Sequence, residues 1–181
     1  TEGIESLIVT STCNRTEIYG FAEHPFQLIK LICENSQGSV EAFQKYGFVY
    51  KNKEAVGHLF RVGTGLDSQI LGDFEIISQI KTSFFQAKSV NLVNAFQERL
   101  INAVIQASKK IKTDTEISSG ATSVSFASVQ YILNNVDDIG NKNILLFGTG
   151  KIGHNTCENL VKHTKNEHIT LINRTKDKAQ K

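Results

Sequence analysis

The sequence predicts an α/β protein in which an α+β domain over residues 1–118 is followed by the beginning of a Rossmann-type doubly wound domain over 119–181. Two observations support this prediction. The first part opens with two strand-like runs and continues with segments whose apolar residues recur at helical spacing. The second part contains a strand, a glycine-rich turn, a helix and a strand in succession, which is the order of a βαβ unit. The polar run at 112–120 is the expected domain boundary.

The elements of the first part follow from their side-chain patterns. Residues 4–10 and 17–21 are rich in β-branched and other apolar side chains and are predicted to be short strands. The reactive side chains between them then lie at a strand end or turn. Pro25 begins a helical pattern with Cys33 on its apolar face, so Cys33 is expected to be a small core residue. Further helices are predicted over 53–62, 73–88 and 96–111, the last with Leu100, Ala103, Val104 and Ala107 on one face.

The second part has the more regular pattern. A βαβ unit requires a strand, a tight turn, a helix that crosses over and a second strand. A helix is predicted first, over 123–134. The first strand of the unit follows at 143–147, the turn at 148–153, the helix up to 163 and the second strand at 168–173.

Composition excludes several classes of protein. The hydrophobic content of 40% is that of an ordinary globular protein, no apolar stretch could span a bilayer and the N-terminus lacks the layout of a signal peptide, so we expect a cytoplasmic protein without a membrane partner. The 3 cysteines are far apart, which fits free thiols rather than a disulfide framework or a metal site. The net charge of +2, without a basic stripe in the sequence, does not by itself indicate a nucleic-acid ligand. A chain that lacks an initiator methionine and stops inside a predicted domain is expected to be a fragment.

The turn at 148–153 has the spacing of a dinucleotide-binding fingerprint. Gly148 permits the tight turn, Gly150 lets the backbone approach a pyrophosphate at the helix N-terminus, and Gly153 allows close packing of helix and strand. The next strand ends in Asn173-Arg174-Thr175 rather than in an acid for the ribose 2′-hydroxyl, and a guanidinium there could hold a 2′-phosphate. NADPH is therefore the expected cofactor. The alternatives are a turn that binds nothing and a solvated Arg174.

Cys13 is the other candidate for chemistry. A thiolate is a competent nucleophile toward an activated acyl carbon, and Arg15 two residues further could stabilise it and hold an anionic substrate group. The polar neighbours from Ser11 to Thr16 favour this interpretation over a buried structural thiol, because an apolar core does not tolerate so many hydrogen-bonding groups.

For His58 and for the turn at 65–73, a purely structural role explains the sequence at least as well as a functional role does. A single histidine on an amphipathic helix, as His58 is, is usually a partly buried structural residue. The glycine-punctuated turn at 65–73 is as consistent with capping of the next helix by Asp73 as with a binding role.

Four separated segments combine into a recognisable set. They are 11–17 (STCNRTE), 58–62 with 65–68 (HLFRV and GLDS), 120–125 (GATSVS), and the 148–153 turn with 173–175. In order and spacing they resemble the glutamyl-tRNA reductases along nearly the whole chain. The first is similar to the nucleophile motif of that family, the second to its second catalytic segment and the third to the entry of its cofactor domain.

The resemblance implies an NADPH-dependent reduction of glutamyl-tRNA(Glu) to glutamate-1-semialdehyde through a cysteine thioester, the first step of tetrapyrrole (porphyrin and haem) biosynthesis by the five-carbon pathway. It implies Cys13 and His58 as catalytic residues and requires no metal. This chain has Asp73-Phe74-Glu75 where the family commonly has Glu-Pro-Gln. The residues implied for the glutamate pocket are Thr12, Cys13, Asn14, Arg15, Ser68, Asp73, Phe74, Glu75 and Gln79. Those implied for the cofactor are Gly148, Thr149, Gly150, Lys151, Ile152, Gly153, Asn173, Arg174 and Thr175.

The resemblance also implies partners and missing parts. The full-length protein is expected to carry further elements before Thr1 and after Lys181, to form a homodimer through a helical domain absent here, and to have glutamate-1-semialdehyde aminomutase as a further partner. Two other functions stay open. A shikimate-dehydrogenase-like NADP oxidoreductase would share the glycine-rich turn but would not explain Cys13, and a non-catalytic tRNA-binding or regulatory module would need none of the reactive residues.

Overall fold

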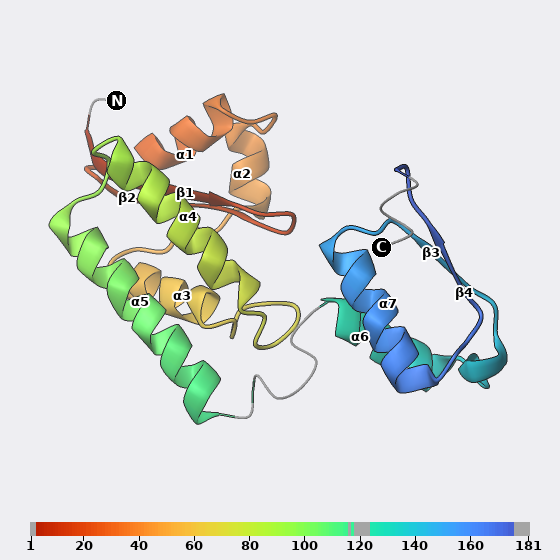
Figure 1. Cartoon of the computed structure of the whole chain (residues 1–181). Helices are drawn as coiled ribbons and strands as arrows, with labels where there is room; N and C mark the ends of the chain where they lie inside the picture. The colour runs from red at the N-terminus through yellow and green to blue at the C-terminus, as the bar shows by residue number, and fades with distance from the viewer. Residues whose placement is uncertain (1–2, 116, 118–123, 176–181) are drawn as a thin grey trace. The chain divides into compact units, whose positions relative to one another are not determined.

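The computed structural model describes residues 3–115, 117 and 124–175. The chain divides into two compact units, Thr1–Thr115 and Glu116–Lys181 (Figure 1). The predicted boundary after residue 118 lies outside the described residues. The first unit contains β1 (Ile4–Ser11), β2 (Thr16–Ala22), α1 (Pro25–Glu34), α2 (Val40–Tyr46), α3 (Lys53–Gly63), α4 (Glu75–Ser89) and α5 (Ala95–Asp114). The second contains α6 (Val124–Asn135), the 3-10 turn η2 (Ile139–Asn141), β3 (Ile144–Phe147), α7 (Lys151–Thr164) and β4 (Ile169–Ile172).

The two predicted N-terminal strands form an antiparallel hairpin. Ser11 pairs with Thr16, so the connecting loop consists of the residues between them. Because side chains alternate along a strand, the partners Ile8 and Tyr19 point to the same face as Glu17. Ile8 is buried in the main core with residues of α3, α4 and α5. The hairpin thus directs Glu17 and Tyr19 toward the helical layer, while α1 packs along β2 (Figure 1).

The main core of the first unit lies between β1 and three helices. Its fully buried members are Ile8, Leu59, Val62, Ile76, Ile77, Ile80, Phe84, Ile101 and Val104. The buried face of α5 differs from the prediction, because Ala103 is exposed and Gln97 is buried. Gln97 is buried since its amide donates a hydrogen bond to the main-chain oxygen of Tyr19 at 3.2 Å, which compensates its desolvation.

Helix α2 is an element that the sequence did not reveal. It begins after Ser39, whose hydroxyl accepts a hydrogen bond from the main-chain N–H of Ala42 at 3.2 Å, and it has 7 residues. A helix of this length has too few apolar repeats to give a clear period. The expectation for Cys33 was also wrong. Helix α1 contains no fully buried residue, and Cys33 is half-buried.

The second unit contains the predicted βαβ order. Strands β3 and β4 are parallel, from the pair Ile144 and Ile169 to the pair Phe147 and Ile172, and α7 connects them. Helix α6 packs against α7, where the Ser125 hydroxyl donates a hydrogen bond to a main-chain oxygen of α7 at 3.1 Å. The glycine-rich turn therefore lies between the first strand of a parallel pair and its crossover helix.

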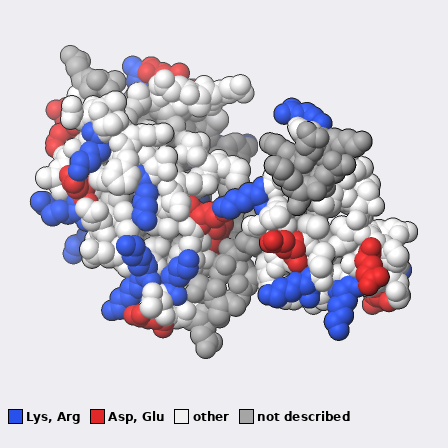
Figure 2. Space-filling view, in the orientation of Figure 1, with Lys and Arg blue, Asp and Glu red and all other residues white. Residues whose placement is uncertain are grey.

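Two surface properties bear on function. No helix among the described residues is long and apolar enough to cross a membrane. On the face drawn in Figure 2, Lys and Arg side chains are interspersed with Asp and Glu, in keeping with a net charge of +2. This face shows no basic stripe of the kind that marks many nucleic-acid sites.

Candidate active site

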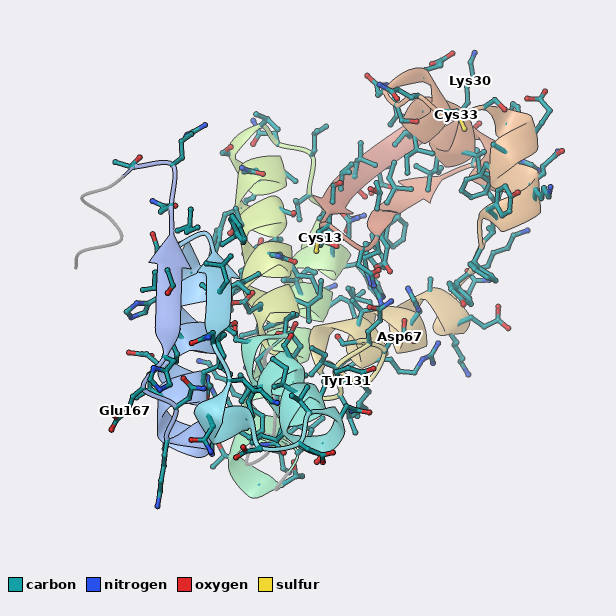
Figure 3. All side chains as sticks on the ribbon, turned by 90° about the vertical axis from the view of Figure 1, so that its right-hand side faces the viewer. Cys13, Lys30, Cys33, Asp67, Tyr131 and Glu167 are labelled. Carbon is teal, nitrogen blue, oxygen red and sulfur yellow. The ribbon has the colours of Figure 1, made fainter. Side chains whose placement is uncertain are left out.

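The loop that carries Cys13 is braced by its neighbours. The main-chain N–H of Thr12 donates to the carbonyl of Arg15 at 2.8 Å, and the Thr12 hydroxyl oxygen accepts from the N–H groups of Asn14 and Arg15 at 3.2 and 3.1 Å. These bonds close a tight turn at the end of the hairpin. Cys13 is exposed on this turn (Figure 3). Cys13 is therefore accessible from solvent, whereas the hydroxyl of Thr12 stabilises the loop by hydrogen bonds.

Arg15 connects the hairpin to the segment that follows α3. Its Nη1 atom lies 3.1 Å from Glu17 Oε1 and 3.1 Å from Asp67 Oδ2, and its Nη2 atom donates to the main-chain oxygen of Asp67. Burial lowers the pKa of Arg15, but the hydrogen bond to Asp67 and the charge of Glu17 outweigh this effect and raise the pKa above its ordinary value. The guanidinium is thus a fixed cation between two carboxylates.

His58 on α3 belongs to the same network. Its Nε2 atom lies 3.0 Å from Glu17 Oε1, and its Nδ1 atom lies 3.9 Å from Asp67 Oδ2. The imidazole stacks on the ring of Tyr50, with centroids 4.6 Å apart and planes at 25°, and more distantly on Tyr19 at 6.5 Å. Its side chain is 13% exposed. The histidine is held in one orientation by a hydrogen bond and a ring stack.

Tyr19 completes the contacts of the Glu17 carboxylate. Its hydroxyl donates a hydrogen bond to Glu17 Oε2. Burial, followed by the charge of Glu17, raises the pKa of Tyr19 above its ordinary value. Tyr19 therefore stays protonated and acts as a donor.

A cavity of about 940 Å³ opens beside this network, which is within the usual range of ligand pockets. Residues of β2, α1, α2, α3 and the 47–52 segment form its walls. Asn14, Arg15 and His58 line it, together with Glu17, Tyr50 and Asp67.

The other residues predicted for the pocket lie elsewhere. Ser68 follows Asp67 and is half-buried, and Asp73 uses its carboxylate to accept the main-chain N–H of Glu75 at 2.9 Å. This contact matches the capping function that was one of the two interpretations of Asp73. Phe74 packs against the core, while Glu75 and Gln79 are exposed at the start of α4. None of these five lines the cavity, and neither do Thr12 and Cys13 of the loop.

Four residues of the network had no predicted role. Glu17 and Asp67 lie within the segments 11–17 and 65–68, but those segments did not indicate which side chains the two carboxylates contact. The spacing of Tyr19 and Glu17 on one strand face was the available signal. Tyr50 precedes α3 in a segment without regular structure, so no periodicity could have indicated it.

Two positions of the glycine-rich turn require glycine, and a third leaves open space. Gly148 has a φ of +91°, and a Cβ atom at Gly153 would lie 1.9 Å from the carbonyl oxygen of Gly148. A Cβ atom at Gly150 would meet nothing within 4 Å, which leaves open space at the start of α7. Gly150 is the N-cap of α7 and provides no side chain to cap the first N–H groups of the helix. The turn can therefore accept an anion.

The end of β4 lies next to this turn. The Asn173 amide oxygen accepts from the N–H of Thr149 at 3.4 Å, and its Nδ2 atom donates to the carbonyl of Thr175 at 2.9 Å. The Thr149 hydroxyl is buried without a partner among the described residues. Arg174 and Thr175 are exposed. The structure thus brings the turn and the Asn173 side chain together, with Arg174 directly beside them in the chain.

Comparison with known proteins decides the family. The model described as "Glutamyl-tRNAGlu reductase, N-terminal domain" matches residues 1–115, which is more than half of the chain. The chain belongs to the glutamyl-tRNA reductase family. A second model, described as "Shikimate / quinate 5-dehydrogenase", matches residues 130–181. The first match contains the Cys13 loop and His58, and the second contains the glycine-rich turn.

Individual relatives agree with this assignment. The chain is 81% identical over 181 residues to glutamyl-tRNA reductase of Flavobacterium psychrophilum, covering 100% of this chain and 44% of that protein. It is 34% identical over 180 residues to the Aquifex aeolicus enzyme, covering 98% of this chain and 44% of that protein. The solved structure of glutamyl-tRNA reductase from Methanopyrus kandleri matches with a TM-score of 0.61 at 25% identity, over 98% of this chain and 42% of that one. The chain therefore spans less than half the length of these relatives.

Proposed function

We propose that this chain carries the reacting thiol of a glutamyl-tRNA reductase, and that the whole protein uses NADPH to reduce glutamyl-tRNA(Glu) to glutamate-1-semialdehyde, the first step of tetrapyrrole biosynthesis. One observation carries the proposal. Cys13 is an exposed thiol on a braced loop, and the end of that loop, Arg15, enters a network with Glu17, His58 and Asp67. A nucleophile, a fixed cation and a histidine thus belong to one small region.

The proposed chemistry starts when the Cys13 thiol gives its proton to His58 and the sulfur attacks the ester carbonyl of the aminoacyl-tRNA. A carbon–sulfur bond forms, the ester bond to the ribose breaks, and the thiol proton leaves with the ribose oxygen, so a glutamyl thioester remains on the enzyme. Arg15 is the proposed partner of the substrate carboxylate, in exchange for its contacts with Asp67. His58 moves the proton. The remaining pocket residues, Thr12, Asn14, Ser68, Asp73, Phe74, Glu75 and Gln79, are assigned to the glutamate pocket by resemblance.

The second unit is proposed to begin a Rossmann-type domain that binds NADPH. The open space at Gly150 and the uncapped N-terminus of α7 support a pyrophosphate at the turn. The residues that would hold the cofactor are those of 148–153 and 173–175, with Arg174 on the 2′-phosphate. When bound, NADPH supplies the hydride that reduces the thioester to the aldehyde.

Two other functions are less well supported. A shikimate-dehydrogenase-like activity would account for residues 130–181 only and would not explain the exposed Cys13 or its loop. A non-catalytic module has no need of an exposed thiol beside a fixed cation. For the whole protein, the resemblance further supports a homodimer, glutamate-1-semialdehyde aminomutase as a partner and a cytoplasmic location, and these are part of the proposal.

Trapping the acyl-enzyme tests the proposal. The full-length enzyme is incubated with glutamyl-tRNA in the absence of NADPH, and its peptides are analysed by mass spectrometry. One glutamyl group is expected on the peptide that contains Cys13, because without hydride the thioester accumulates.

Serine variants of the three cysteines provide the controls. Cys13→Ser should abolish the adduct and reduce turnover by at least about a thousandfold, since serine is a far weaker nucleophile at neutral pH. Cys33→Ser and Cys157→Ser should keep both, because these partly buried thiols lie outside the network. Undiminished turnover by Cys13→Ser would end the thioester proposal.

A further inference from the structure

The carboxylate of Glu17 contacts three side chains of the site. Its Oε1 atom accepts a hydrogen bond from Arg15 Nη1 at 3.1 Å and lies 3.0 Å from His58 Nε2. Its Oε2 atom accepts one from the Tyr19 hydroxyl. The Glu17 side chain is 17% exposed. A guanidinium can only donate, and the Tyr19 hydroxyl donates as well, so Glu17 acts as the acceptor in both of these hydrogen bonds.

This arrangement determines which nitrogen of His58 carries a hydrogen. An ionised carboxylate only accepts hydrogen bonds, so the Nε2 atom of His58 must donate to Glu17. In the neutral ring the lone pair is then on Nδ1. The nearest carboxylate oxygen to Nδ1, Asp67 Oδ2, is 3.9 Å away, which is too far for a hydrogen bond.

Ring stacking and the contact with Glu17 hold the imidazole in one orientation. Tyr50 lies against one face of the imidazole at 4.6 Å between centroids, and Tyr19 is stacked at 6.5 Å. A half-turn of the ring about its Cβ–Cγ bond would bring Cε1 instead of Nε2 to the Glu17 carboxylate and would lose this hydrogen bond. The orientation seen is therefore the one in which every hydrogen has an acceptor.

We propose that Glu17 is a positioning residue that makes Nδ1 of His58 the nitrogen that moves the proton during thioester formation. This inference rests on the proposed function. Nδ1 takes the thiol proton of Cys13 as the carbon–sulfur bond forms, and the ring becomes an imidazolium beside the Glu17 carboxylate. The same proton passes to the ribose oxygen as the ester bond breaks, so the site returns to its initial protonation state.

Nitrogen NMR of the full-length enzyme tests the orientation without reference to activity. With ¹⁵N-labelled histidine, the neutral imidazole of His58 is expected to show a protonated Nε2 and an unprotonated Nδ1. The signals are assigned by their absence in His58→Gln. A neutral ring with its hydrogen on Nδ1 would overturn the inference.

A kinetic comparison tests the consequence. Glu17→Gln keeps the size of the side chain and removes the charge, so adduct formation at saturating glutamyl-tRNA should slow by about 100-fold, because the imidazolium loses its counter-ion. The half-saturating concentration should change less, since Arg15 keeps its contacts with Asp67. The matched control is Glu34→Gln, the same substitution at an exposed carboxylate outside the network, which should leave the rate unchanged.

The outcomes separate the two proposals. If the unmodified enzyme forms an adduct and Glu17→Gln forms it equally fast, with a native circular dichroism spectrum, the role of Glu17 is refuted and the thioester proposal stands. A rise in the half-saturating concentration alone would also refute it, because Glu17 would then act only through Arg15. If the unmodified enzyme forms no adduct, the proposed function is wrong and the inference falls with it.

Discussion

Arg174 follows the end of β4, and its side chain is exposed. Arg174→Ala is expected to weaken NADPH binding by about tenfold or more and NADH binding by less than about twofold, because only NADPH has a 2′-phosphate for a charge-assisted hydrogen bond. Fluorescence titration of the full-length enzyme measures both dissociation constants. Lys162→Ala, which removes another exposed cation of the second unit, should affect neither. Equal losses for the two cofactors would make Arg174 a bystander.

Single residues of the site were predictable where a local motif contains them. Cys13, Arg15 and His58 could be named because reactive side chains stood in a polar turn or in a segment that resembled a known one. Their partners could not be named, since Glu17 meets His58 41 positions away and Arg15 meets Asp67 52 positions away. Such contacts depend on the packing of a hairpin against a helix, which no local pattern encodes.

Helix α3 positions His58 by packing closely on α5. A Cβ atom at Gly63 would lie 2.2 Å from Val104 Cγ1 in the buried core, whereas one at Gly57 would come no closer than 3.6 Å to Arg61 Nη1. Gly63→Ala should therefore lower the free energy of unfolding by about 1–3 kcal/mol through overpacking. Gly57→Ala in the same helix should be neutral or raise it by up to about 1 kcal/mol, because alanine favours helix. Urea unfolding followed by circular dichroism measures both, and equal effects would contradict the tight contact between α3 and α5.

Elements were predictable in proportion to their length and regularity. The hairpin strands, the long helices and the βαβ order were confirmed, with ends that moved by one to three residues, as at α5, which ends at Asp114 instead of residue 111. Helix α2 was missed because it has 7 residues. The buried face of α5 was predicted wrongly because Gln97 lies in the core, where it donates a hydrogen bond to strand β2. Glutamine is usually a surface residue, so composition alone would have placed Gln97 at the surface.

The two proposed sites lie in different compact units, Cys13 in the first and the glycine-rich turn in the second. Each half-reaction should therefore fail independently. Cys13→Ser is expected to abolish the adduct and to change NADPH affinity by less than about twofold. Gly150→Ala fits the fold, because its methyl group meets nothing within 4 Å, yet it would occupy the space proposed for the pyrophosphate.

Gly150→Ala should thus reduce NADPH affinity by about tenfold or more and leave adduct formation without NADPH unchanged. Mass spectrometry and cofactor titration on the same full-length variants give both readings. A Gly150→Ala enzyme that binds NADPH normally would remove the turn from the cofactor site, and one that fails to form the adduct would show that the two units do not act separately.

If Arg15 binds the substrate carboxylate, as proposed, its pairing with Asp67 has a consequence for substrate choice. The cation already holds a carboxylate and a main-chain oxygen of its own chain, so an incoming acyl group must compete with an internal ligand. A glutamyl carboxylate offers two charged oxygens and can win this exchange, whereas the neutral amide of a glutaminyl group offers one weaker acceptor and cannot. Discrimination between two acyl groups of nearly equal size would then come from what the site must give up to bind them, in addition to the contacts that it gains.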